Sequence, residues 1–377
     1  MTVDHLYKDA LSLLKALIQT PSLSREEDKT ADLIYSYLQE RGVKVNRYLN
    51  NVWAVNEHFD KSKPTLLLNS HHDTVKPNPQ YTRDPFAAGE EDGKLFGLGS
   101  NDAGGCLAAL IATFLHFHDQ ADLAWNVVIA ATAEEEISGF NGIEALLRAP
   151  EFMLSVGQSS TSGEAAGLYK NWSGIVGEPT QMKLAVAEKG LLVIDCTAEG
   201  VAGHAAREEG VNAIYKAVDD INWFRTYQFP KVSPTLGPVK MNVTVISTEN
   251  KAHNVVPAAC SYTVDIRVTD AYTHEEILDI VRSNISSQVK PRSTRLRATA
   301  IPMNHPLVRA GLSLEIDYYG SPTSSDKALM PFPALKCGPG DSARSHTADE
   351  FIYVVELEEG IIEYIEIISR AMRLHRS

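Results

Sequence analysis

The sequence lacks the cysteine spacing of a thiolate metal site or of a disulfide framework. Its four cysteines lie far apart and include no C-x-x-C pair, so we expect reduced, mostly buried thiols at Cys106, Cys196, Cys260 and Cys337. It also contains no G-x-S-x-G segment, the turn that presents the nucleophile of α/β-hydrolases. These absences disfavour a disulfide-stapled fold, a thiolate zinc site and a serine hydrolase of that kind.

Positive charge and long apolar runs are also scarce. The 35 Lys and Arg residues are outnumbered by 48 Asp and Glu, and the net charge of −13 argues against a general affinity for nucleic acid or anionic membranes. The longest apolar stretch, residues 106–115, is too short to span a bilayer. The N-terminal stretch is amphipathic and carries acids, unlike the apolar core of a signal peptide. We therefore expect a cytoplasmic protein with no nucleic-acid or membrane partner.

The first part of the chain predicts an α/β domain. A length of 377 residues exceeds what one hydrophobic core usually organises, so we expect two domains. Up to about residue 180, helix-like segments alternate with short apolar runs. We predict helices over 4–18, 26–41 and 105–117, and strands over 52–56, 65–69, 126–132 and 175–177. Apolar strands separated by helices predict a mixed, mainly parallel sheet that is covered on both faces.

From residue 182 the pattern changes to a ferredoxin-like one. We predict, in order, a strand over 184–198, a helix over 211–227, strands over 239–247 and 260–268, a helix over 274–289 and a strand over 295–301. This is the β-α-β-β-α-β order of a smaller α+β domain. The remaining residues return to the first style, with a strand over 334–337 and a helix over 357–374. We therefore predict one domain, 1–181 and 302–377, interrupted by a second domain, 182–301.

Carboxylates and imidazoles follow the apolar strands of the first domain. The strand endings lead into His71-His72-Asp73, Glu134-Glu135-Glu136, Glu178 and the loop that ends in His346, while Asp102 follows a glycine-rich turn. In an open α/β sheet, ligands bind just beyond the carboxyl ends of the strands. Taken singly, each piece has an ordinary alternative, such as a surface turn or a solvated helix start. Their common place at the strand ends favours one shared site.

Histidines and carboxylates without thiolates suit zinc, cobalt or manganese. One ion would need only three of these side chains. Five candidates, one of them able to bridge, suggest two metal ions about 3.5–4 Å apart.

Five ordered motifs resemble the co-catalytic zinc amidohydrolases and peptidases. That family includes acetylornithine deacetylase, succinyl-diaminopimelate desuccinylase, aminoacylase and glutamate-releasing carboxypeptidases. The motifs are His71-x-Asp73, Gly97-x-Gly-x-x-Asp102, Ala133-Glu-Glu-Glu136, Gly177-Glu-Pro-Thr180 and Gly338-Pro-Gly-(x)5-His346, and the middle of the chain adds Gly203-His-Ala-Ala206 and Asn254-Val-Val-Pro257. The segments 131–136 and 338–351 look most similar to acetylornithine deacetylase. The resemblance implies a zinc-peptidase-like catalytic domain, with the insertion as a dimerisation and lid domain.

The resemblance also implies residue roles. His71 and Glu178 would hold one Zn²⁺, Glu136 and His346 the other, and Asp102 would bridge them, with Co²⁺ or Mn²⁺ able to substitute. Asp73 would orient His71, and Glu135 would be the general base. His204 would donate to the developing oxyanion, across a homodimer formed by the inserted domain, and Asn254 and Arg267 would bind substrate. Because relatives usually have Asp where this chain has Glu134, the base could instead be Glu134.

The implied function is removal of an acyl group from an amino acid. Deacylation of N-acetyl- or N-succinyl-ornithine in arginine biosynthesis is the leading expectation. Succinyl-diaminopimelate desuccinylation, or a dipeptidase or carboxypeptidase activity, is the alternative within the family. A non-catalytic binding protein on the same fold is disfavoured because every proposed ligand and the base are present. After Asp102 the chain reads Ala-Gly-Gly-Cys, where relatives commonly have Met-Lys-Gly-Gly, and this change weakens a substrate assignment by analogy.

Overall fold

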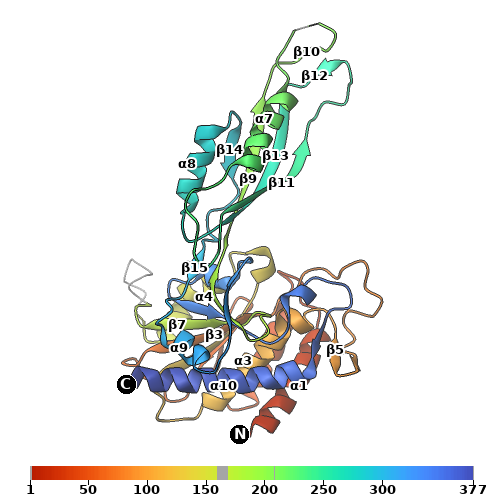
Figure 1. Ribbon diagram of the computed structural model, residues 1–377. Helices are drawn as coiled ribbons and strands as arrows, with labels where there is room; N and C mark the ends of the chain where they lie inside the picture. Colours follow the sequence, from red (N-terminus) through yellow and green to blue (C-terminus); the bar gives the residue numbers. More distant parts are fainter. Residues whose placement is uncertain (1, 159–168, 208, 377) are drawn as a thin grey trace. The chain divides into compact units, whose positions relative to one another are not determined.

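The computed structural model describes residues 2–158, 169–207 and 209–376 (Figure 1). The chain divides into two compact units. Unit 1 comprises Met1–Val186, Ile301–Tyr319 and Ser325–Ser377, and unit 2 comprises Ala187–Ala300 and Gly320–Ser324. The sequence predicts an insertion over 182–301, and the dimerisation and lid roles of this insertion stay predictions.

A mixed sheet whose central strands are parallel has most of its strands in unit 1, and its last strand, β15, falls within the range of unit 2. The strand order is β1-β2-β6-β3-β7-β17-β8-β15, and β16 pairs with β8. Strand β3 runs parallel to β6 and β7, and β17 runs parallel to β7. The strands are β1 (Val45–Tyr48), β2 (Asn51–Val55), β3 (Thr65–His71), β6 (Asn126–Thr132), β7 (Trp172–Val176), β8 (Leu184–Glu188), β15 (Thr299–Ala300), β16 (Tyr318–Ser321) and β17 (Ala334–Lys336). The predicted α/β class with a mixed, mainly parallel sheet is confirmed.

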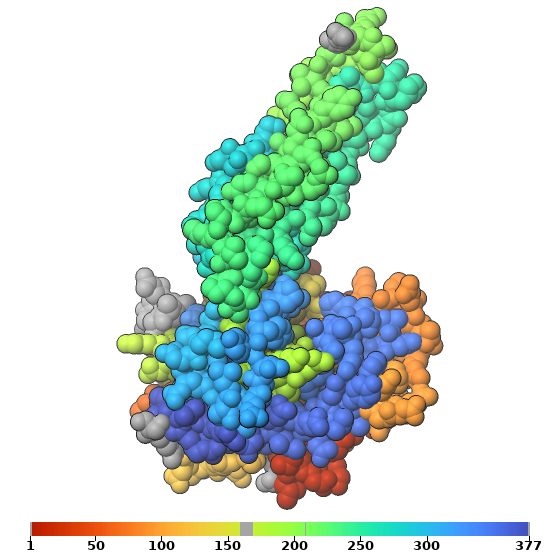
Figure 2. Space-filling model, viewed as in Figure 1, coloured from red at the N-terminus to blue at the C-terminus, as the bar shows by residue number. Residues whose placement is uncertain are grey.

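Helices cover both faces of this sheet. Successive side chains of a strand point to opposite faces, and here both faces are apolar. On β3, Leu66 and Leu68 belong to one core cluster and Leu67 to another. The first cluster joins the sheet to α1 (Val3–Ile18), α2 (Asp28–Gln39), α3 (Gly105–Phe117), α9 (Pro306–Leu312) and α10 (Val354–Arg376). The second joins it to α4 (Ile143–Arg148) and α5 (Pro150–Ser155). In the space-filling view, α10 and the segment around α9, in blue, form much of the visible surface of unit 1 (Figure 2).

Unit 2 has the predicted β-α-β-β-α-β order. Its sheet is antiparallel, with strand order β11-β13-β9-β14. The elements in chain order are β9 (Gly190–Glu199), α7 (Ala213–Thr226), β11 (Lys240–Ser247), β13 (Ala259–Val268), α8 (His274–Asn284) and β14 (Gln288–Pro291). A separate two-stranded ribbon pairs β10 (Gly203–His204) with β12 (Val255–Val256). Side chains from both helices and from the sheet form the core of this unit.

The last strand of unit 2 differs from the prediction. The sequence predicts a helix over 274–289 and a strand over 295–301, but α8 ends at Asn284 and β14 spans Gln288–Pro291. The helix stops because the next amide groups bond elsewhere. The backbone N–H groups of Ser286 and Ser287 donate to the carboxylate of Asp220 on α7, at 3.0 and 2.9 Å. This contact between distant segments has no local sequence signal.

A small antiparallel sheet in unit 1 combines β4 (Glu90–Glu91), β5 (Lys94–Phe96) and β18 (Phe351–Tyr353), in the order β18-β5-β4. In its register, Phe351 lies opposite Phe96. The turn that carries Asp102 follows β5, and the segment that carries His346 precedes β18, so this pairing places the two segments side by side. Within the described ranges 2–158, 169–207 and 209–376, no helix combines the length and the apolar character needed to cross a membrane.

Candidate metal centre

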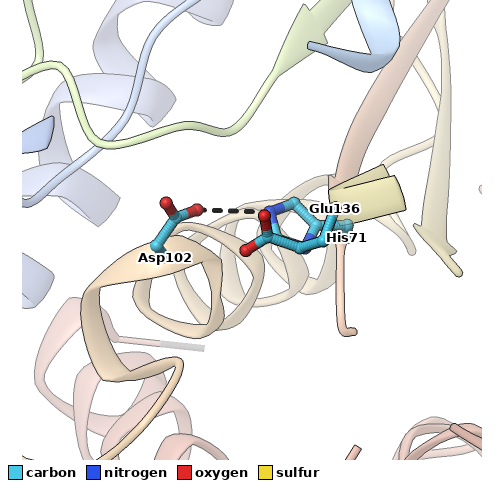
Figure 3. Close-up of side chains that lie close together, drawn as sticks. All are labelled: His71, Asp102 and Glu136. Carbon is cyan, nitrogen blue, oxygen red and sulfur yellow. Dashed lines mark hydrogen bonds and ion pairs between the residues drawn. The ribbon is translucent and has the colours of Figure 1, made fainter. Parts of the chain in front are cut away.

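The predicted ligands come from neighbouring strands of unit 1. His71 is the last residue of β3, Glu136 follows β6, Glu178 follows β7, and His346 ends the loop after β17. These four strands are neighbours, and their parallel pairings place their carboxyl ends at the same edge. Asp102 lies in the turn before α3, with its side chain directed toward His71 (Figure 3).

Asp102 lies between the two histidines. Its Oδ1 is 3.3 Å from Nε2 of His71, and its Oδ2 is 3.7 Å from Nε2 of His346. Nε2 of His71 is also 3.9 Å from a carboxylate oxygen of Glu178. Nε2 of His346 lies 3.0 Å from a carboxylate oxygen of Glu136. The geometry therefore forms two imidazole–carboxylate pairs on either side of one carboxylate.

Two overlapping groups of side chains have the spacing of metal ligands. Ligand atoms of His71, Asp102 and Glu136 lie within 4.8 Å of one another, and the same holds for His71, Glu135 and Glu178. The second group places the carboxylate of Glu135 beside the ligands, where a general base would have to lie. These predicted residues are thus brought together, whereas their individual roles remain proposals.

The ring of His71 is held so that Nε2 faces the centre. Its Nδ1 lies 3.0 Å from the backbone carbonyl oxygen of Asp73 and 3.4 Å from that residue's Oδ1. An N–H at Nδ1 would donate to these oxygens, which leaves the lone pair of Nε2 available for a metal ion. The prediction that Asp73 orients His71 thus corresponds to contacts through both its carbonyl and its carboxylate.

Asp73 makes further contacts that sequence reasoning missed. Its Oδ1 accepts from the backbone N–H of Glu135 at 3.0 Å, and its Oδ2 accepts from that of Glu136 at 3.2 Å. Oδ2 also accepts from the hydroxyl of Ser24 at 2.7 Å. Asp73 therefore holds the turn that presents both Glu135 and Glu136.

Glu134 and His72 point to other partners. The carboxylate of Glu134 accepts from the side-chain amide of Asn141 at 2.7 Å. His72 lies between the hydroxyl of Thr30, at 2.9 Å from Nδ1, and the backbone carbonyl of Asn50, at 2.8 Å from Nε2. Burial lowers the pKa of His72 to about 4, so the ring is neutral at neutral pH. Both side chains support the surrounding turns.

The concentration of acids perturbs the protonation of the site. Burial and then the charge of Asp102 raise the pKa of Glu178 to about 8. Burial also raises the pKa of Glu135 well above its ordinary value. The hydrogen bond to Glu136 raises the pKa of His346 to about 9. A divalent cation would relieve the repulsion among these carboxylates, so the donor set fits metal ions.

Two more carboxyl groups adjoin the centre without having been predicted. Asp326, buried at the start of the 3-10 turn Asp326–Leu329, accepts from the hydroxyl of Thr132 at the end of β6, at 2.7 Å. Glu350 is buried and accepts from backbone N–H groups of the turn that carries Asp102. Neither side chain follows an apolar strand, so neither has the sequence feature that the proposed ligands share.

The predicted residues of unit 2 lie at two places. His204 is on the β10–β12 ribbon, and the backbone carbonyl of the neighbouring Asn254 accepts from the N–H of Ala205 at 2.9 Å. Arg267 is on β13, where its guanidinium forms a two-point ion pair with Asp265 at 2.8 and 3.0 Å. The structure thus places His204 and Asn254 together and gives Arg267 an acidic partner.

Comparison with known families agrees with this geometry. Residues 67–372 match the model of peptidase family M20/M25/M40. The chain belongs to this family. It is a hydrolytic amidohydrolase, and the curated M20 relatives that it matches include succinyl-diaminopimelate desuccinylases. Succinyl-diaminopimelate desuccinylase 2 from Ruegeria sp. (strain TM1040) is 29% identical to this chain, over 72% of this chain and 68% of the relative. The Maricaulis maris (strain MCS10) protein is 27% identical, over 73% and 70%. A special closeness to acetylornithine deacetylase is not confirmed.

Solved M20 structures share the fold over almost the whole chain. The metallo-carboxypeptidase from Sulfolobus solfataricus superposes with a TM-score of 0.71 at 17% identity, covering 97% of this chain and 99% of the other. A Bacillus subtilis protein, described as a dinuclear metal-binding peptidase of the M20 family, has a TM-score of 0.66 at 14% identity, covering 98% and 99%. At these identities the likeness shows the fold alone.

Proposed function

We propose that this M20 protein hydrolyses the amide bond of an N-acyl amino acid at a centre of two divalent metal ions, with Zn²⁺ as the first candidate and Co²⁺ or Mn²⁺ as substitutes. The observation that carries the proposal is the position of Asp102, whose two oxygens face His71 and His346 at 3.3 and 3.7 Å. His71 and Glu178 would hold one ion, Glu136 and His346 the other, and Asp102 both. Bound ions of this kind lower the pKa of water and polarise a carbonyl group.

Glu135 is proposed as the general base. Its carboxylate would take a proton from the attacking water and deliver it to the nitrogen of the leaving amine. Its place beside His71 and Glu178 supports this role. The competing candidate, Glu134, is bonded to Asn141 instead.

His204 is proposed as the oxyanion donor. The backbone N–H of Ala206 donates to Nδ1 of His204 at 3.1 Å. Nδ1 is therefore an acceptor, so a neutral ring carries its proton on Nε2 and can donate from there. The chain itself thus selects the tautomer that the role requires.

We further propose that the protein is a homodimer joined through unit 2. Strand β11 is at the edge of the sheet of unit 2 and exposes apolar side chains, with Val245 54% and Ile246 53% exposed. An unpaired edge of this kind can add a strand from a second copy, and a twofold axis would make the contact reciprocal. In such a dimer, His204 would act in the partner's centre.

The substrate proposed first is N-succinyldiaminopimelate. The matching relatives that carry this name support it more than they support N-acetylornithine, and they would place the reaction in lysine rather than arginine biosynthesis. Arg267 and Asn254 would bind the substrate, since a guanidinium can take a carboxylate in two-point fashion. The cytoplasmic location stays a prediction.

A substrate panel tests this assignment. The zinc-loaded protein is assayed for amine release from N-succinyldiaminopimelate, N-acetylornithine, N-succinylornithine, N-acetylcitrulline and a dipeptide. Asp102→Ala serves as the inactive control. The proposal expects N-succinyldiaminopimelate to have the highest kcat/KM. A preference for an ornithine derivative would replace the substrate but keep the reaction, and no hydrolysis of any amide would overturn the proposal.

A further inference from the structure

Glu350 is a buried carboxyl group with no part in the proposed chemistry. Glu350 is only 1% exposed. One carboxylate oxygen accepts from the backbone N–H groups of Asn101 and Asp102, both at 2.9 Å. The other accepts from the N–H of Gly99 at 3.2 Å. All three donors belong to the turn that carries the proposed bridging ligand.

The pairing of β5 with β18 explains why these groups meet. Phe96 lies opposite Phe351 in an antiparallel register, so the residues after Phe96 run back along those before Phe351. The N–H of Gly97 continues this pairing by donating to the backbone carbonyl of Glu350 at 2.9 Å. Beyond that point the turn leaves the strand, and the side chain of Glu350 replaces the missing strand as its acceptor.

A carboxylate is chemically suited to this position. Asn101 and Gly99 are buried and Asp102 is partly buried. Water therefore cannot replace the carboxylate as acceptor for their N–H groups without entering the interior. A carboxylate has two oxygens, each able to accept more than one hydrogen bond, whereas a side-chain amide has one such oxygen. Only a carboxylate can therefore accept from all three N–H groups, whereas Gln would place an NH₂ group against at least one of these N–H groups.

The segment that contains Glu350 contacts Asp102 at both ends. Nε2 of His346 lies 3.7 Å from Oδ2 of Asp102, and the carboxylate of Glu350, four residues later, accepts from the backbone N–H of Asp102. The short chain between the two contacts fixes the distance from the imidazole to the bridging carboxylate. We infer that Glu350 is a positioning residue, which holds Asp102 between His71 and His346 and so sets the affinity of the centre for its second metal ion. The inference rests on the two-metal centre proposed above.

Metal titration tests this role without relying on activity. The full-length protein is stripped of metal and titrated with Co²⁺, and calorimetry and the visible Co²⁺ spectrum report the affinity of each ion. In Glu350→Gln we expect the first ion to bind as in the wild type and the second to bind about 10–100-fold more weakly, the usual effect of losing a group that orients a ligand. Glu350→Asp keeps the charge but is one methylene shorter, so it should weaken the second ion as well.

Asp349→Asn is the matched control. The carboxylate of Asp349 is adjacent in sequence but accepts from the N–H groups of Thr82 and Arg83, at 2.9 and 3.0 Å, so this variant should bind both ions normally. A wild type that binds fewer than two Co²⁺ ions would refute the two-metal centre itself. A wild type that binds two, with Glu350→Gln equally tight at both, would overturn the positioning role alone. Circular dichroism checks folding, and loss of native structure in both Glu350 variants would also overturn it, because the residue would then support the whole unit.

Discussion

Replacing Asp73 with Asn should weaken both the fold and the activity. Asp73 is fully buried, and its carboxylate accepts from the N–H groups of Glu135 and Glu136 and from the hydroxyl of Ser24. Asn keeps one acceptor oxygen and replaces the other with an NH₂ group. The hydroxyl of Ser24 can rotate to accept from that group, but one of the two backbone N–H groups would face a second donor.

The structure gives the size of the effect. One buried N–H without an acceptor costs about 1–3 kcal/mol of the free energy of unfolding. The same change loosens the turn that presents the proposed base and one proposed ligand. Loss of a group that orients metal ligands typically lowers metal affinity or activity by about 10–100-fold. We therefore expect Asp73→Asn to show both losses together.

Urea unfolding of the metal-free protein measures the first loss, and kcat/KM of the zinc-loaded protein measures the second. Ser24→Ala is the matched control, because it removes the donor at 2.7 Å but leaves both backbone N–H groups with their acceptors. Its cost should be smaller, about 0.5–1.5 kcal/mol. An Asp73→Asn variant with wild-type stability and wild-type kcat/KM would refute the reasoning. A loss of activity at unchanged stability would show that the contacts to the turn contribute nothing to the free energy of unfolding.

Four other outcomes are expected. Glu135→Gln should keep its bound Co²⁺ and lose about 10²–10⁴-fold in kcat, whereas Glu134→Gln should retain turnover; the reverse pattern would exchange their roles. A chelator should abolish hydrolysis and added Zn²⁺ or Co²⁺ should restore it, so activity that is indifferent to chelation would contradict the metal centre. Mixing inactive His204→Ala and Asp102→Ala proteins should restore part of the activity in heterodimers, and no recovery despite confirmed subunit exchange would argue against a histidine acting across subunits. Burial lowers the pKa of His305 to about 4, below the value of about 6.5 in an unfolded chain. Between these two values the unfolded state binds more protons, so the free energy of unfolding should fall as the pH drops from about 6.5 to about 4. Chemical unfolding of His305→Asn should show a smaller fall over this range, and an equal fall would contradict this.

Elements with a strong apolar pattern could be predicted almost to the residue. The strand predicted over 126–132 is β6, Asn126–Thr132, and the helix predicted over 105–117 is α3, Gly105–Phe117. Every residue of β6 is buried, so its sequence has no polar interruption that could confuse its limits. The long strand predicted over 184–198 is instead two strands, β8 and β9, interrupted at Lys189. An alternating pattern alone does not reveal such a break.

The gathering of the proposed ligands could be predicted because four of them follow strands that are neighbours in the sheet, whereas their individual roles rest on the family resemblance. The contacts that hold those ligands could not. The bond from the N–H of Asp102 to Glu350 joins residues 248 positions apart, and its donor is a backbone group that every residue type except proline possesses. A side chain that binds backbone amides leaves no motif in the sequence. For the same reason, the bond from Ser287 to Asp220 that follows the end of α8 was not foreseen.

The contact between Glu136 and His346 has a consequence for how the chain folds. These residues are 210 positions apart, and unit 2 lies in the sequence between them. During synthesis, His71, Asp102, Glu136 and Glu178 all emerge before the first residue of that unit, whereas His346 emerges after its last. Contacts of such long range slow folding, because the chain loses entropy on closing the loop before the contact repays it. His346 can therefore join the other four side chains of the proposed centre only after all of unit 2 has been synthesised.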